Sequence, residues 1–117
     1  MSDRLRIATR KGLFTVTRRA SGWTLDAPAF LGDPVSMVLD DPRDGALYAA
    51  LNLGHFGVKL RRSRDDGRTW EELEAPAYPP QPEGAEGLPW KMVQIWSLET
   101  GGTDEPGVLW AGTLPGG

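Results

Sequence analysis

Two adjacent carboxylates in the segment SRDDGRTW, residues 63–70, are the first side chains in this sequence that could do chemistry. Paired carboxylates serve as general acid and base, or as ligands for a metal ion. Neighbouring residues of an extended chain point in opposite directions, so Asp65 and Asp66 are not expected to converge on one substrate. A calcium loop needs acidic residues at alternate positions, and position 61 is Arg. The segment therefore favours a turn over a catalytic or metal site.

The other candidates for chemistry lie in short glycine-containing segments. His55, the single histidine, could act as a general base or contact a ligand, and Phe56 beside it could stack on a sugar ring. Arg10 and Lys11 could hold a carboxylate or a phosphate. Each also has a structural interpretation, because loop histidines and turn charges are commonly just solvated. The sequence contains neither a glycine-rich phosphate loop nor metal-ligand spacing, so we expect no cofactor and no metal.

Composition narrows the class of protein. The 117 residues suffice for one small domain with a modest core. The net charge of −3 and the dispersed basic residues give no reason to expect nucleic acid or a membrane surface as partner. The absence of cysteine fits a reducing compartment, and the N-terminus lacks the apolar run of a secretory signal. No stretch approaches the roughly 18 apolar residues of a membrane span, so a cytoplasmic protein is expected.

Turn-forming residues divide the sequence into short apolar runs. There are 15 glycines and 10 prolines, and no window has convincing helical spacing, so the sequence predicts an all-β fold. A long loop rich in proline and glycine is expected over 75–91. The expected strands cover residues 4–9, 13–17, 23–25, 35–39, 46–52, 58–62, 69–73, 92–99 and 108–113.

The strand pattern repeats along the chain. LRIATRKGLFTV and LYAALNLGHFGVKL each contain an apolar run, a loop with glycine and a second apolar run, and VLWAGTLPGG begins the pattern again. Periods of about 40–60 residues with four short strands are typical of β-propeller blades. With strands labelled a to d from centre to rim, residues 1–26 supply strands b–d of a first blade. Residues 34–74 then form a complete blade, and 92–117 supply strands a and b of a third.

This organisation amounts to an incomplete propeller of about two and a half blades. A propeller closes with at least four blades, and an unpaired strand at the edge of a sheet is a feature that folded proteins avoid. We therefore expect a fragment of a longer chain. A ring assembled from copies of the chain and an engineered propeller fragment are the alternatives.

The segment 63–70 also carries a family resemblance. It follows the pattern Ser-x-Asp-x-Gly-x-Thr-Trp and resembles the Asp box of the bacterial-neuraminidase (BNR) repeat, found in sialidases and many other propellers. The matching residues are Ser63, Asp65, Gly67, Thr69 and Trp70. The chain is similar to the N-terminal part of a sialidase-like BNR/WD40/YVTN-type propeller protein. The resemblance implies that this turn joins strands c and d, is structural, and lies away from any active site.

The residue types of the motif suit such a turn. Ser63 and Asp65 can accept hydrogen bonds from backbone N–H groups. Gly67 can supply a positive φ, and Trp70 can pack between neighbouring sheets. Asp66 is not one of the matching positions of the motif, and Asp66→Asn is expected to change little.

Strand direction separates two faces of such a propeller. Loops a–b and c–d lie at one face, whereas loops b–c and d–a lie at the other, where propellers of this kind bind ligands. The second face carries the b–c loops RKG and NLGHFG and the d–a loops around 26–34 and 75–91. The ligand-binding candidates on it are Arg10, Lys11, Asn52, His55, Phe56, Trp90 and Lys91, with Trp96 and Glu99 expected at the central channel. Packing between blades is the alternative interpretation of the two tryptophans.

The resemblance does not extend to a catalytic set. Sialidases use an arginine triad, an Asp acid/base and a Tyr–Glu nucleophile pair. The segment LRIA has Arg6 and Ile7 but neither the aromatic residue nor the proline of the family motif, and Tyr48 has no evident glutamate partner. No catalytic residue is assigned.

Three functions remain open at this stage. The first is a scaffold whose open face binds a carbohydrate, another small ligand or a partner, completed by missing blades or further copies of the chain. The second is a sialidase-like glycoside hydrolase whose catalytic residues lie partly beyond residue 117. The third is a self-assembling or engineered propeller fragment.

Overall fold

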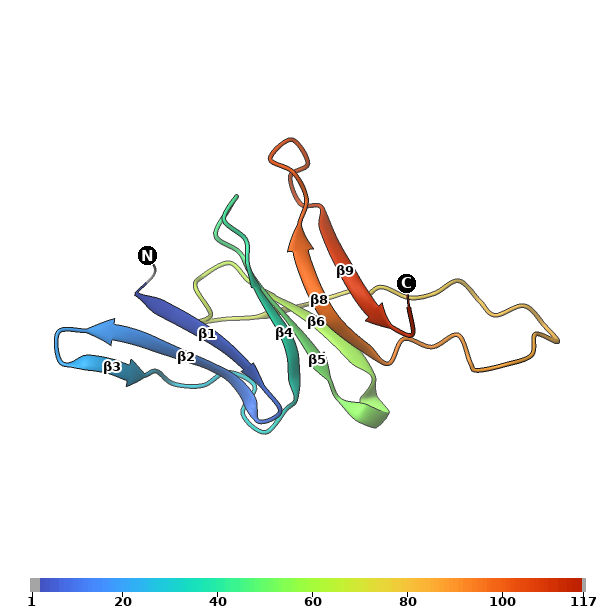
Figure 1. Cartoon of the computed structure of the whole chain (residues 1–117), viewed down its shortest axis with the longest axis horizontal. Helices are drawn as coiled ribbons and strands as arrows, with labels where there is room; N and C mark the ends of the chain where they lie inside the picture. The colour runs from blue at the N-terminus through green and yellow to red at the C-terminus, as the bar shows by residue number, and fades with distance from the viewer. Residues whose placement is uncertain (1–2, 117) are drawn as a thin grey trace.

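Nine antiparallel β-strands and one short 3-10 helix make up the computed structural model, which describes residues 3–116. The molecule is elongated, with extents of 62 × 36 × 21 Å, and the strands form three separate sheets (Figure 1). The elements are β1 (Arg4–Thr9), β2 (Gly12–Arg19), β3 (Gly22–Leu25), β4 (Val35–Asp40), β5 (Leu47–Asn52), η1 (Gly54–Phe56), β6 (Val58–Ser63), β7 (Glu71–Leu73), β8 (Gln94–Thr100) and β9 (Leu109–Leu114).

Each sheet is a meander of strands that are consecutive in the chain. The first sheet has the order β1-β2-β3, the middle sheet β4-β5-β6-β7, and the last sheet β8-β9. In the first sheet Leu5 pairs with Val16, and Val16 with Leu25. Short turns suffice for such antiparallel neighbours, which is why glycine and aspartate are frequent between the strands. The three sheets do not close on themselves.

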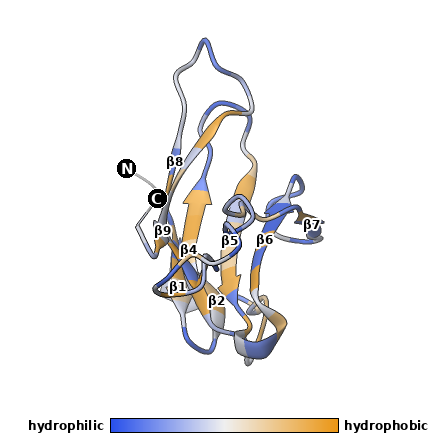
Figure 2. Ribbon diagram, turned by 90° about the vertical axis from the view of Figure 1, so that its right-hand side faces the viewer, coloured by the Kyte–Doolittle hydropathy of each residue, from blue (hydrophilic) through white to orange (hydrophobic). Residues whose placement is uncertain are grey.

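The middle sheet is packed on both faces, which explains its composition. All but the last residue of β5 are buried, as expected for a strand covered on both sides. Tyr48 and Ala50 belong to the cluster shared with Ile95 and Leu98 of β8. Residues 49 and 51 belong to a second cluster, with Leu13 of β2. Figure 2 shows β4 and β5 as predominantly hydrophobic and the connections as largely polar. The core therefore consists of two layers, one on each face of β4–β7.

The turn between β1 and β2 fixes how the first sheet meets the middle one. Gly12 has a φ of 136°, and a Cβ there would lie 3.0 Å from the carbonyl oxygen of Ala29. Leu13 and Ala29 exchange backbone hydrogen bonds of 2.8 and 2.9 Å. Only glycine allows this close approach, which holds the β3–β4 connection against the start of β2.

An all-β fold is confirmed, with the strands close to the predicted ranges. The last strand of the middle sheet begins at Glu71, so the predicted strand over 69–73 is two residues too long at its start, where Thr69 and Trp70 still belong to the turn. The described residues contain no helix long and apolar enough to cross a membrane.

Candidate functional site

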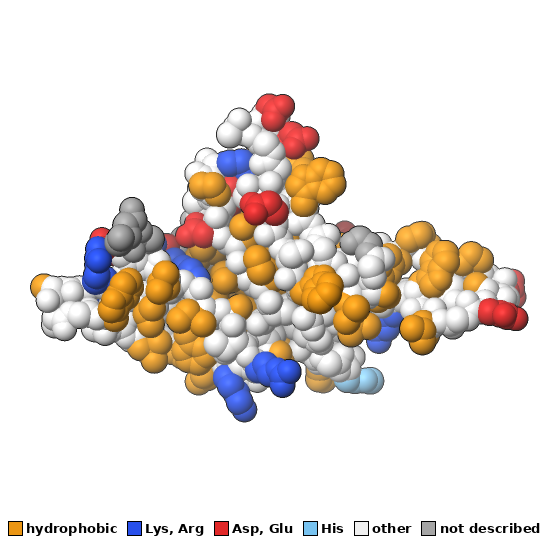
Figure 3. Space-filling model, in the orientation of Figure 1, with side chains coloured by type: hydrophobic (Ala, Val, Ile, Leu, Met, Phe, Trp, Pro, Cys, Tyr) orange, Lys and Arg blue, Asp and Glu red, His pale blue; other side chains and the backbone are white. Residues whose placement is uncertain are grey.

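A groove of about 1010 Å³ opens at the end of the sheets where β1 turns into β2 and β5 into β6. Residues from all three sheets reach it, because β4 and β8 both begin at this end (Figure 1). Lys and Arg side chains gather along the lower edge of the molecule in Figure 3, on the same side as these turns. The groove is lined by Ala8, Thr9, Arg10, Asp33, Pro34, Val35, Ser36, Asn52, Leu53, Gly54, Phe56 and Gln94.

Backbone-directed hydrogen bonds hold the two turns at the groove in shape. Thr9 donates through Oγ1 to the carbonyl of Gly12 at 2.8 Å and accepts from the N–H of Lys11 at 3.0 Å. Asn52 accepts from the N–H of Gly54 at 3.1 Å through its side-chain oxygen. Such local bonds are how Thr and Asn stabilise turns. The groove floor is set in the same way, since Ser36 donates to the carbonyl of Ile95 at 2.5 Å and so ties β4 to β8.

Three side chains at the groove retain unused hydrogen-bonding capacity. Within residues 3–116, no hydrogen-bond partner is present for the guanidinium of Arg10, the side-chain nitrogen of Asn52 or the side-chain amide of Gln94. They supply planar donors from three different sheets. Asp33 adds one carboxylate acceptor. Convergent polar groups of this kind in a concave site are what orient a small ligand.

An aromatic pair stands at the rim of the groove. Phe56 is 75% exposed, and its ring meets that of His55 edge to face, with centroids 5.7 Å apart and an interplanar angle of 74°. Both belong to the 3-10 helix between β5 and β6. An exposed ring beside polar donors offers an apolar platform to a ligand that has both apolar and polar faces.

The structure brings some of the predicted residues together and separates others. Arg10, Asn52 and Phe56 line the groove, and His55 and Lys11 adjoin it. Trp90 instead lines a separate apolar pocket of about 400 Å³ with Tyr78, Leu88 and three prolines, and Lys91 follows it in the same long loop. That loop runs far from the sheets before returning to β8 (Figure 1).

Trp96 is also apart from the groove. It lies on the outer face of β8 and is 59% exposed, because it follows the inward-pointing Ile95. The irregularity between Ile95 and Ser97 lets Leu98 point inward as well. The three open sheets of residues 3–116 do not enclose a central channel. The expected position of Trp96 and Glu99 at such a channel therefore stays a prediction.

Sequence reasoning missed Asp33, Ser36 and Gln94 as lining residues. Asp33 stands just before Pro34 and β4, and Gln94 opens β8, so each occupies the same end of its strand. The signal was present in the strand directions, since the starts of β4 and β8 must lie beside the β1–β2 and β5–β6 turns. Their residue types gave no indication of a site, because polar residues are common beside the start of a strand.

The segment 63–70 lies at the other end of the middle sheet, and its polar side chains bond within the segment itself. The hydroxyl of Ser63 accepts from the N–H of Gly67 and donates to Asp65, both at 2.8 Å. Asp65 also accepts from the N–H of Thr69 at 2.8 Å and from its hydroxyl. The Thr69 hydroxyl, followed by its N–H and by Ser63, lowers the pKa of Asp65 from 3.8 to about 2. This carboxylate is occupied in holding the turn.

Trp70 closes the turn onto the neighbouring sheet. Its indole nitrogen donates to the carbonyl of Gly67 at 3.2 Å, and Gly67 has a φ of 88°. The ring packs edge to face on Phe30, with centroids 4.9 Å apart. The tryptophan therefore joins the turn to the β3–β4 connection.

Asp66 has partners that sequence reasoning missed. It accepts from Arg4 at 2.5 Å and from Arg6 at 2.7 Å, both on β1. Partial burial acts to raise the pKa of Asp66, but the hydrogen bonds and charges of the two arginines outweigh it, and the pKa lies below its ordinary value. Arg6 is thus engaged in an ion pair between sheets. The two carboxylates of the motif point to different partners.

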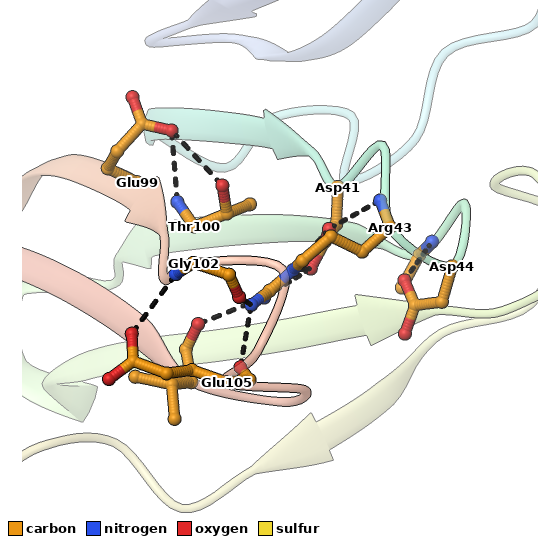
Figure 4. A network of polar contacts seen from close by, with 9 residues as sticks. Asp41, Arg43, Asp44, Glu99, Thr100, Gly102 and Glu105 are labelled. Carbon is orange, nitrogen blue, oxygen red and sulfur yellow. Dashed lines mark hydrogen bonds and ion pairs between the residues drawn. The ribbon is translucent and has the colours of Figure 1, made fainter.

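A second polar network fixes the last sheet. Arg43 donates to Asp41 within the β4–β5 turn and to the carbonyls of Gly102, Glu105 and Val108 in the β8–β9 turn (Figure 4). Asp41 is 1% exposed. The side-chain hydrogen bond from Arg43 is the main cause that lowers the pKa of Asp41. The network is structural and lies at the end opposite the groove.

No protein-family model matches the chain, and no curated protein matches its sequence. Residues 3–116 contain no group of three or more His, Asp or Glu side chains placed to hold a metal ion.

Proposed function

We propose that this chain is part of a sialidase-like, Asp-box β-propeller and acts as a scaffold that binds a carbohydrate in the groove. Two observations support the propeller. The three antiparallel meanders are stacked in chain order, and the turn at 63–70 uses each of its motif residues for its own closure. Further sheets, supplied by more of the same chain or by other chains, would complete the ring.

The observation that carries the binding proposal is the groove with its unused planar donors. Sugar rings present axial C–H faces, which stack on aromatic rings, and an edge of hydroxyl groups. Phe56 offers the ring, and Arg10, Asn52 and Gln94 offer donors from three sheets. Asp33 can accept from a hydroxyl. A carbohydrate uses both kinds of contact at once, whereas a purely apolar ligand would leave the donors unpaired.

The charges at the groove favour a sugar that carries a carboxylate. Arg10 lies in the groove lining and Lys11 follows it in the same turn. Two cations and one carboxylate, that of Asp33, are therefore present at the groove. A guanidinium binds a carboxylate through two parallel hydrogen bonds. Glycoside hydrolysis, by contrast, uses a pair of carboxyl groups across the scissile bond, and the lining has one. We therefore propose that the groove binds a carbohydrate, with no hydrolytic step.

Calorimetric titration with lactose and with 3′-sialyllactose tests this proposal, since the two probes differ by one carboxylated sugar. We expect the acidic probe to bind with a dissociation constant of roughly 0.1–1 mM, and lactose several-fold more weakly. Phe56→Ala should weaken both probes about tenfold by removing the stacking surface. Arg10→Gln should bring the two affinities within about twofold of each other.

Trp90→Ala is the matched control, because that tryptophan is also exposed but lies in the other pocket. It should bind both probes as the unaltered chain does. Failure of both probes to bind, or weakening by Trp90→Ala equal to that by Phe56→Ala, would contradict the proposal.

A further inference from the structure

The outer face of the first sheet is apolar and has nothing packed on it within residues 3–116. The register places Leu5 beside Val16, and Val16 beside Leu25, on the side away from the middle sheet. Leu25 is 64% exposed and Trp23 52%. Hydrophobic side chains gather over β1–β3 at the left of Figure 3. We define this first end face by Leu5, Ile7, Phe14, Val16, Trp23 and Leu25.

The outer face of the last sheet is apolar as well. Ile95 and Leu98 of β8 and Leu109 and Ala111 of β9 pack against the core, so Trp96, Trp110 and Leu114 lie on the other face. Among these, Trp96 is 59% exposed and Trp110 66%. We define the second end face by Trp96, Trp110 and Leu114. Exposed apolar patches that contain large aromatic side chains are typical of an interaction surface.

Each end face carries a charged side chain, and the two differ in sign, since the register places Arg18 beside Trp23 on the first face and Glu99 beside Trp110 on the second. Residues 3–30, which contain the first sheet, hold six Lys or Arg and two Asp, of which Arg4 and Arg6 pair with Asp66 on the side of the middle sheet and Arg18 pairs with Asp3. Residues 92–116, which contain the last sheet, hold three acidic residues and no Lys or Arg. Complementary potentials favour one face meeting the other, and like charges disfavour either face meeting its own kind.

The two faces also point in opposite directions. The first sheet packs on one side of β4–β7 and the last sheet on the other, so the end faces terminate the stack at its two ends. A second copy placed head to tail would continue the stack of sheets in the same order. Such an interface joins two different patches and leaves one of each kind free for a further copy.

We propose that the first end face of one copy of this chain binds the second end face of another copy, head to tail. The contact is a small apolar sheet-on-sheet interface with Arg18 on one face and Glu99 on the other. Small interfaces of this kind are weak, so association should depend on concentration between roughly 10 μM and 1 mM.

Sedimentation velocity of the chain over that concentration range tests the proposal. The average mass should rise with concentration, and the rise should be reduced by high salt because charge steers the contact. Leu25→Asp, on the first end face, and Trp110→Asp, on the second, should each sediment as a monomer throughout. Both side chains are exposed, so circular dichroism should show an unaltered fold.

The decisive sample is an equal mixture of Leu25→Asp and Trp110→Asp. One intact face of each kind remains, so the mixture should form dimers and nothing larger. Leu31→Asp is the matched control, since Leu31 is 71% exposed outside both end faces, and it should associate like the unaltered chain. A chain that stays monomeric up to about 1 mM, or a single-face variant that dimerises alone, would overturn the head-to-tail proposal.

Discussion

Replacing Trp70 by Ala should remove a contact that fastens the turn at 63–70 to the β3–β4 connection. The indole is mostly buried, packs on Phe30 with centroids 4.9 Å apart, and donates to the carbonyl of Gly67. Burying about 150 Å² of apolar surface contributes about 4 kcal/mol at about 25 cal/mol per Å². Truncation of a buried aromatic residue typically costs about 3–5 kcal/mol, and we expect that range here.

Urea unfolding followed by far-ultraviolet circular dichroism measures this loss without relying on tryptophan emission. A domain of this size is stable by about 5–15 kcal/mol, so Trp70→Ala could unfold the chain outright. Trp70→Phe provides a second measurement, because it keeps most of the stacking and should cost about 1–2 kcal/mol. Trp90→Ala, in the exposed loop, should change the free energy of unfolding by less than about 1 kcal/mol.

A double-mutant cycle with Phe30→Ala isolates the ring contact. We expect a coupling free energy of about 0.5–1.5 kcal/mol between Trp70 and Phe30, as for other edge-to-face pairs. A loss below about 1 kcal/mol for Trp70→Ala, together with zero coupling, would refute the role assigned to this tryptophan.

Three further predictions concern the ion pairs and the motif carboxylates. Because the pKa of Asp65 is lowered to about 2, the stability that its carboxylate contributes is fully present above pH 3.8 and is lost as the pH falls through about 2. The urea concentration at the unfolding midpoint should drop over that pH window, and it should drop less in Asp65→Asn. Asp41→Ala should cost about 2–4 kcal/mol in urea unfolding by leaving Arg43 without its buried partner, whereas Asp40→Ala, at an exposed position, should be nearly neutral. Asp66→Asn should cost under about 1 kcal/mol at low salt, with little difference from the unaltered chain in 1 M NaCl.

The strands could be predicted because this sequence marks its turns heavily. Gly12, Gly45 and Gly67 each stand in a turn with a positive φ, and the runs between turns are short and apolar. The hydrogen bonding of the turn at 63–70 could be predicted from residue types alone, since Ser63 and Asp65 bond within eight residues of sequence. Local chemistry of this kind needs no knowledge of the tertiary structure.

What depends on the arrangement of sheets could not be predicted. No pattern in the sequence indicated the partners of Asp66, because Arg4 and Arg6 lie on a different sheet, about sixty residues earlier in the chain. Trp90 was assigned to the ligand face, but the proline-rich loop carries it into a separate pocket. Gln94 was overlooked because nothing in its own surroundings distinguishes it from a strand residue in contact with solvent.

Heteronuclear NMR of the chain titrated with 3′-sialyllactose tests the central claim most directly, because it locates the ligand on the molecule. The proposal predicts that the amide shift changes are confined to the groove: residues 9–11, 33–36, 52–57 and 94. Changes centred on the pocket around Tyr78 and Trp90, or no changes at millimolar ligand, would contradict it.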